Sequence, residues 1–175
     1  MATFVVVELP RLATPGTDYS RRHPGLTVDF LLHHEPPRTL RLFFRAVGRE
    51  DDLEGLLDAL RSSYPSLRPI GDPEPRARAG TLEMHDLPHD EVAAAVAAFT
   101  RRQAVEFEWG RIEEGVVFSR LLVPAAEAQG MAQRLRGDLL AAGLDANVSV
   151  ESQDDRELAP WLELLRGIRG WHPQR

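Results

Sequence analysis

One short phrase occurs twice in this chain and constrains the fold more than any other feature. T-F-V-V-V-E-L-P occupies residues 3–10, and T-L-E-M-H-D-L-P occupies residues 81–88. An arginine pair follows each copy, and a V-x-F triplet follows each pair, beginning at Val28 and at Val105. Because self-similarity at a fixed spacing marks a repeated folding unit, the sequence predicts two copies of one structural plan.

Alternation of apolar and polar residues identifies the strands of each copy, and apolar stripes identify the helices. In the first copy we expect strands at 26–34, 39–47 and 67–70 and a helix from Asp51-Asp52 to near Pro65. Around Pro15 and Pro24-Gly25 we expect little more than a turn. In the second copy we expect a helix capped by Asp90, strands at 104–109, 116–123 and 146–150, a turn at 113–115, and a helix from Pro124 to Gly143.

Each copy therefore follows a β-α-β-β-α-β order, the ferredoxin-like plan. We predict an α+β chain built as a tandem duplication of this ferredoxin-like unit, with antiparallel sheets that carry helices on one face. The predicted units are residues 1–75 and 76–152. Residues 153–175 are expected to form a C-terminal amphipathic helix and tail, whose stripe includes Trp161 and Ile168. That stripe either covers the core or forms a homodimer contact.

Composition excludes several classes of protein. The net charge of −6 argues against an electrostatic attraction to nucleic acid or anionic lipid. The absence of cysteine removes disulfides, zinc–thiolate sites and thiolate nucleophiles. The apolar run at the N-terminus, Phe4–Val7, is too short for a signal peptide, and no run approaches the length of a membrane span. We therefore expect a cytoplasmic protein with no membrane partner.

The face of each sheet that lacks helices is the most informative surface. We expect Val5, Val7, Asp29, Leu31, His33, Arg41, Phe43 and Arg45 on this face in the first copy. In the second we expect Glu83, His85, Glu106, Glu108, Val116, Phe118, Arg120 and Leu122. Such a mixture is too apolar for a wholly solvated face and too charged for a core. It predicts two sheets that face each other, or a partner chain, across a partly polar layer.

That layer is a natural ligand cleft. Its candidate binding residues are His33, Arg41, Phe43, Arg45, His85, Phe118 and Arg120. The competing interpretation is structural: the charges form cross-strand salt bridges, Asp29 with Arg41 or Arg45, and Glu106 or Glu108 with Arg120. The same face then binds nothing.

Catalytic and metal chemistry have little support in the sequence. The chain lacks a nucleophile elbow, a phosphate-binding loop and a dinucleotide fingerprint. His85 and His89 are separated by Leu87-Pro88 at a strand-to-helix junction, so they do not share a helical face as metal-binding histidines at this spacing do. We therefore expect no catalytic residues, no metal and no cofactor.

Two segments carry a resemblance to a known family. F-F-R-A-V-G-R-E-D-D-L-E-G-L-L-D-A-L-R-S-S-Y-P-S-L (43–67) and R-L-R-G-D-L-L-A-A-G-L-D-A-N-V-S-V (134–150) resemble parts of the N-terminal regulatory domain of bacterio-opsin-activator-type helix-turn-helix transcription regulators. The resemblance implies a sensory domain without catalytic residues. In that family a DNA-binding module follows the domain, whereas this sequence ends at Arg175, so we expect no direct DNA binding by this chain.

Two functional hypotheses follow. The first is a non-catalytic regulatory or ligand-sensing domain, linked to transcription regulation, that binds a small-molecule effector or a partner protein at the helix-free faces. The second is an α+β-barrel-type enzyme that holds a substrate, haem or metal between its two sheets.

Overall fold

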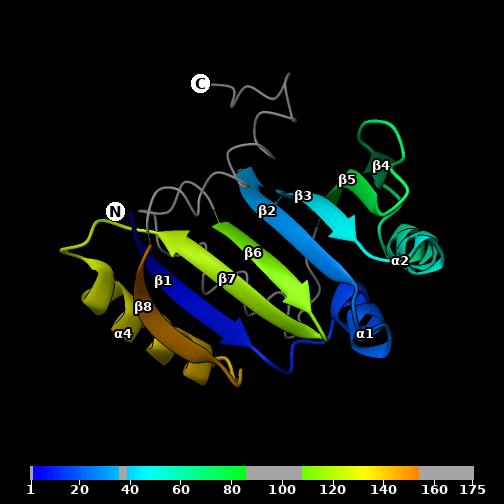
Figure 1. Cartoon of the computed structure of the whole chain (residues 1–175). Coiled ribbons are helices and arrows are strands. Elements are labelled where there is room, and N and C mark those ends of the chain that lie inside the picture. Colours follow the sequence, from blue (N-terminus) through cyan, green and yellow to red (C-terminus); the bar gives the residue numbers. More distant parts are fainter. Residues whose placement is uncertain (1, 36–38, 86–107, 154–175) are drawn as a thin grey trace.

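A single antiparallel sheet organises the molecule. The computed structural model describes residues 2–35, 39–85 and 108–153. The described strands form one eight-stranded sheet in the order β4-β5-β3-β2-β6-β7-β1-β8, which Figure 1 shows as a continuous twisted layer. The strands are β1 (Ala2–Leu9), β2 (Thr27–Glu35), β3 (Thr39–Val47), β4 (Arg68–Pro69), β5 (Ala77–His85), β6 (Glu108–Glu113), β7 (Val116–Leu122) and β8 (Asn147–Gln153). The predicted α+β class with antiparallel pairing is confirmed, but the strands form one sheet rather than two.

The first strand of each predicted unit pairs with strands of the other unit. β1 lies between β7 and β8, and β5 lies between β3 and β4. The centre of the sheet is the antiparallel pair of β2 and β6. Pairing therefore crosses the predicted boundary between residues 75 and 76 in both directions. The boundary itself stays a prediction.

Three helices cover one face of this sheet in the described part of the chain. They are α1 (Pro15–Arg22), α2 (Glu50–Ser63) and α4 (Ala128–Ala141). In Figure 1, α4 lies behind β1 and β8, whereas α1 and α2 lie together at the other end. Leu53 and Leu56 of α2, with Met131 and Leu135 of α4, join the strand residues that face them in one hydrophobic core.

Helix α1 corrects the expectation of a mere turn. Thr14 is its N-cap, and the hydroxyl of Thr14 accepts a hydrogen bond from the amide of Thr17 at 3.1 Å. The hydroxyl of Thr17 in return accepts one from the amide of Thr14 at 2.8 Å. Pro15 occupies the first turn, where its missing N–H has no helical partner to lose and its fixed φ suits the helix. A reciprocal cap and a well-placed proline thus support two turns of helix.

Two tight connections agree with the sequence. The β6–β7 hairpin turns through Glu114 and Gly115 at φ of 49° and 79°, the two positive values that a type I′ hairpin turn requires. Gly143, at φ 74°, ends α4. Its amide donates to the carbonyl of Leu140, and the amide of Leu144 donates to that of Leu139, both at 3.0 Å. This is the Schellman arrangement, in which glycine satisfies the last carbonyls of a helix.

The start of two helices differs from expectation. Helix α4 begins at Ala128 rather than Pro124, because residues 125–127 form a turn. Helix α2 has Arg49 as its N-cap, and the run of acids occupies the first turn, where negative charge favours the helix dipole. The described strand β6 extends to Glu113, four residues beyond the predicted strand end at 109.

Strand β1 carries a correction to the predicted faces. Val5 and Val7 belong to the core on the helix-covered side and not to the helix-free face. The helix-free face of β1 is formed instead by Phe4, Val6 and Glu8, since side chains alternate along a strand. Residues Phe4 to Val7 are buried on both faces, so alternation carries no information there.

Several predictions lie outside the described residues. These are the helix capped by Asp90, the strand residues 104–107, Glu106, and the C-terminal helix and tail at 153–175, of which only the end of β8 at Gln153 is described.

Candidate functional site

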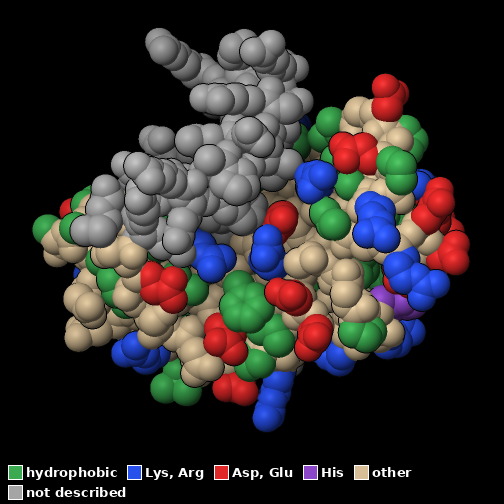
Figure 2. Space-filling model, in the orientation of Figure 1, with side chains coloured by type: hydrophobic (Ala, Val, Ile, Leu, Met, Phe, Trp, Pro, Cys, Tyr) green, Lys and Arg blue, Asp and Glu red, His purple; other side chains and the backbone are tan. Residues whose placement is uncertain are grey.

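The helix-free face of the sheet is built from rows of residues that lie opposite one another on neighbouring strands. Figure 2 shows this face, where arginine, acidic and hydrophobic side chains are interleaved. One row crosses the centre of the sheet and contains Arg45 of β3, Asp29 of β2, Arg111 of β6, Phe118 of β7 and Glu8 of β1. Arg45, Asp29 and Arg111 thus place charges of alternating sign on three adjacent strands, about 5 Å apart. Phe118 separates this group from Glu8.

Asp29 and Arg111 form the strongest contact in this row. The Arg111 guanidinium donates from Nε to Asp29 Oδ1 at 2.7 Å and from Nη2 to Oδ2 at 3.4 Å. This fork-to-carboxylate geometry favours the charged forms of both groups. The hydrogen bond to Asp29 raises the pKa of Arg111 above its ordinary value, so the guanidinium remains charged at every pH near neutrality.

The two arginines of β3 also reach carboxylates. Arg41 Nη2 donates to Glu83 Oε1 at 2.8 Å, directly across the β3–β5 pair. Arg45 faces Asp29 in the register but makes its ion pair with Glu74, at 3.5 Å from Nη2 to Oε2. The predicted cross-strand salt bridges therefore form with different partners: Asp29 pairs with Arg111 rather than with Arg41 or Arg45.

Arg120 of β7 behaves differently from these three arginines. Its side chain is half-buried and makes no hydrogen bond or ion pair with any residue that the structure describes. Val6 lies opposite it on β1, and Phe118 and Leu122 flank it along its own strand. We call Val6, Glu8, Phe118, Arg120 and Leu122 the Arg120 surface. The side chain of Glu8 also makes no hydrogen bond or ion pair within the described part of the chain.

Apolar residues on the helix-free face differ widely in exposure. Phe43 is 7% exposed and Leu31 4%, although neither belongs to the main core. Phe118 is half-buried, and Leu122 is 47% exposed. Near β3, the apolar side chains of this face are therefore buried, whereas near β7 they leave apolar surface exposed. Two facing sheets would bury Phe43, Phe118 and Leu122 alike, and only Phe43 is buried.

The single sheet separates the predicted site residues into two groups. Arg41, Phe43 and Arg45 stand on β3, whereas Phe118 and Arg120 stand on β7, three strands away and therefore about 14 Å distant. In the register, the backbone of His33 lies opposite Arg41 and that of His85 opposite Thr39; the histidine side chains lie outside the described part. The described strands supply no second sheet to enclose a shared cleft.

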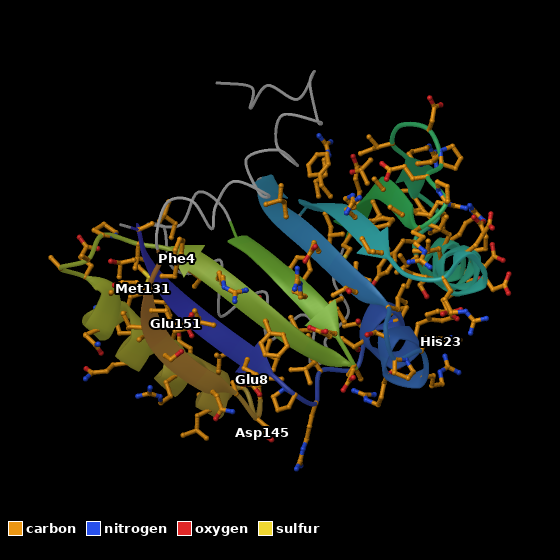
Figure 3. All side chains as sticks on the ribbon, viewed as in Figure 1. Phe4, Glu8, His23, Met131, Asp145 and Glu151 are labelled. Carbon is orange, nitrogen blue, oxygen red and sulfur yellow. The ribbon has the colours of Figure 1, made fainter. Side chains whose placement is uncertain are left out.

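Labelled side chains in Figure 3 place Phe4 and Glu8 toward opposite ends of β1, with Glu151 on the neighbouring β8.

Glu8 and Arg111 were not among the predicted site residues. The sequence did contain a signal for Arg111, because R-I-E-E-G-V-V (111–117) includes a Glu-Gly hairpin turn. A strand that continues up to this turn includes Arg111, which the structure places opposite Asp29. Glu8 was hidden because a strand buried on both faces shows no alternation.

A second polar cluster joins helices α1 and α2 on the covered side. The rings of Tyr19 and His23 stack with centroids 4.1 Å apart, and His23 Nδ1 lies 2.9 Å from Asp52 Oδ1. Burial, with the nearby charge of Asp52, raises the pKa of Tyr19. The Tyr19 ring lies against Gly55, where a Cβ would approach its Cζ to 2.9 Å. Its contacts fasten two helices together, so we assign it a structural role.

Within residues 2–35, 39–85 and 108–153, no group of three or more histidine, aspartate or glutamate side chains is arranged to hold a metal ion. No helix among these residues has the length and apolar character needed to cross a membrane.

No protein-family model matches the chain, and no curated protein matches it.

Proposed function

We propose that this chain is a non-catalytic regulatory domain that senses a small-molecule effector on its helix-free face, at the Arg120 surface. The observation that carries the proposal is the contrast among the arginines of this face. Arg41, Arg45 and Arg111 each have a carboxylate partner, and Arg120 has none among the described residues. A partly desolvated guanidinium gains most from a ligand that supplies the missing negative charge.

The surroundings of Arg120 support a ligand with an apolar part. Phe118 and Leu122 stand two residues before and after it on the same face, and Leu122 is 47% exposed. Ligand sites combine apolar area with a few polar anchors. An organic acid therefore fits this surface better than an inorganic anion does.

A link to transcription regulation is part of the proposal. It is supported by the resemblance of residues 43–67 and 134–150 to the regulatory domain of bacterio-opsin-activator-type regulators. In this structure the first segment spans most of β3, α2 and the turn leading to β4, and the second spans the end of α4 and the start of β8. The effector would act by changing the contacts of the chain with a partner protein.

We also propose that the chain is a tandem duplication of a ferredoxin-like unit in which the first strands have changed places. In a split βαβ unit the third strand lies between the first and second, and the fourth lies beside the first. The order β4-β5-β3-β2 has this form if β5 takes the place of β1. The order β8-β1-β7-β6 has it if β1 takes the place of β5. Both halves support the same interpretation.

A ligand screen tests the sensing function. The wild-type chain and Arg120→Gln are compared by thermal shift against a library of small organic acids, with Arg45→Gln as the matched control on the same face. We expect at least one acid to raise Tm of the wild type and of Arg45→Gln, and to lose that effect in Arg120→Gln. If every ligand that stabilises the wild type stabilises Arg120→Gln equally, the Arg120 surface is not the site.

A further inference from the structure

We infer that the ligand of the Arg120 surface is a zwitterion, an α-amino acid with an apolar side chain. This inference rests on the proposed function and specifies the chemistry of its effector. It derives from Glu8, the second charged residue of the surface.

Glu8 and Arg120 are neighbours that do not pair. Val6 lies opposite Arg120 and Glu8 lies opposite Phe118, so Glu8 and Arg120 occupy diagonal positions on β1 and β7. Diagonal neighbours have backbones about 7–8 Å apart, which long side chains can span. No ion pair joins the two residues, and neither has another partner among the described residues.

A comparison within the same sheet shows what a completed pair looks like. Glu83 stands directly opposite Arg41 and binds it at 2.8 Å. The residues directly opposite Glu8 are Phe118 on β7 and Asn147 on β8, so the register does not provide Glu8 with a facing cation. The β1–β7 pair thus presents one negative and one positive group side by side, each available to a ligand.

Two free charges of opposite sign select against simple ions. An anion bound to Arg120 would meet the unpaired carboxylate of Glu8, and a cation bound to Glu8 would meet the guanidinium. An α-amino acid places a carboxylate and an ammonium on one carbon, so it satisfies both residues at once. Its side chain then packs on Phe118 and Leu122, which supply apolar area beside the charges.

Three related compounds test this inference. L-Leucine carries both charges, N-acetyl-L-leucine lacks the ammonium, and isopentylamine lacks the carboxylate. Tm of the wild-type chain is measured with each at equal concentration and ionic strength. We expect L-leucine at about ten times its Kd to raise Tm by about 3 °C, and the two analogues to raise it by less than a third of that amount. Glu8→Gln and Arg120→Gln should each abolish the effect, and Arg45→Gln should retain it.

The outcomes separate this inference from the proposed function. If N-acetyl-L-leucine stabilises the wild type, loses its effect in Arg120→Gln and exceeds L-leucine, the ligand is a simple acid. The inference is then wrong while the proposed function stands. If L-leucine stabilises Glu8→Gln and Arg120→Gln as well as the wild type, it binds elsewhere and the inference is again wrong. If neither these compounds nor the acid library changes Tm, both proposals fail.

Discussion

At the scale of single residues, the stability of this protein depends on whether each buried polar group finds a partner. Thr17 and Thr81 differ in this respect. The Thr17 hydroxyl donates to the carbonyl of Leu12 at 2.7 Å inside the cap of α1. The hydroxyl of Thr81, opposite Phe43 on the helix-free face, is buried and has no hydrogen-bond partner among the described residues. An unsatisfied buried hydroxyl lowers stability, whereas a satisfied one contributes to it.

Valine at these two positions should therefore have opposite effects. Thr81→Val replaces the hydroxyl with a methyl group of similar size, so we expect unchanged stability or a gain of about 0.5–1 kcal/mol. Thr17→Val leaves the Thr14 amide without its acceptor and the Leu12 carbonyl without its donor, so we expect a loss of about 1–3 kcal/mol. Urea denaturation measures both. A loss of more than about 1 kcal/mol for Thr81→Val would mean that its hydroxyl has a partner.

Tyr19 predicts a pH dependence at the alkaline end. Its pKa is raised, first by burial and then by the charge of Asp52, so the folded state favours the neutral phenol. Between the unfolded pKa near 10 and the higher folded pKa, the unfolded chain releases the proton first. Stability from this group is complete below pH 10 and is lost as the pH rises above it.

The measurement is the free energy of unfolding as a function of pH, for the wild type and for Tyr19→Phe. We expect the wild type to lose stability more steeply above pH 10, because the variant keeps the ring stacked on His23 but has no proton to lose. Absorbance at 295 nm gives an independent check, since one of the two tyrosines should ionise late. Parallel stability curves would show that the environment of Tyr19 does not disfavour its anion.

At the scale of elements, glycine has opposite roles in the strands and in a helix. Gly80 of β5 lies opposite Phe44, and Gly110 of β6 lies opposite Phe30. A Cβ at position 80 would approach Phe44 Cζ to 2.7 Å, and one at position 110 would approach Phe30 Cζ to 2.5 Å. Each phenylalanine thus packs over a glycine across the strand pair. In α4, a Cβ at Gly137 would meet nothing within 4 Å.

Substitutions should separate these roles. Gly110→Val forces the Phe30 ring from its position in the core, and we expect a loss of about 2–3 kcal/mol. Gly137→Ala removes backbone freedom from an exposed helical position, and we expect a gain of about 0.5–1 kcal/mol. Thermal unfolding of the two variants, compared with the wild type, tests both directions. Equal losses in the two would contradict the packing argument.

At the scale of the whole molecule, β1 and β5 hold the two parts of the chain together, because each pairs with strands of the other part. Each of these strands is an inner strand of the half formed mainly by the other part. Residues 71–76, which connect β4 to β5, are exposed. Cutting this connection should therefore leave both parts held by complete strand ladders on either side of β1 and β5.

A protease site inserted between Gly71 and Asp72 tests this interlock. After cleavage, we expect the two fragments to co-elute in gel filtration at the mass of the intact chain and to separate only in denaturant. The uncut protein carrying the same insertion is the control. Separation of the fragments in native buffer would show that β1 and β5 return to their own halves.

Local features of the chain were predictable from the sequence because their causes are local. The alternating residues of β2, β3 and β7 identified the strands and the face that each side chain occupies. The leucine stripe of α2 and the Gly143 stop of α4 identified two helices. Helix α1 also had a readable signal, Thr14-Pro15 at its start, but the nearby glycines and prolines obscured it. The predicted site residues whose side chains are described lie on the helix-free face, as predicted: Arg41, Phe43, Arg45, Phe118 and Arg120.

The choice of strand partners was decided only by the tertiary structure. Backbone hydrogen bonds between strands are alike in every pairing, so nothing in the sequence of β1 specifies β7 and β8 over β3 and β4. Because Phe4, Val5, Val6 and Val7 are all buried, the strand also lacked the alternation that would reveal its two faces. That one pairing brings Glu8 beside Arg120 and places Arg120 far from Arg41, since residues distant in the chain become neighbours only when the whole sheet forms.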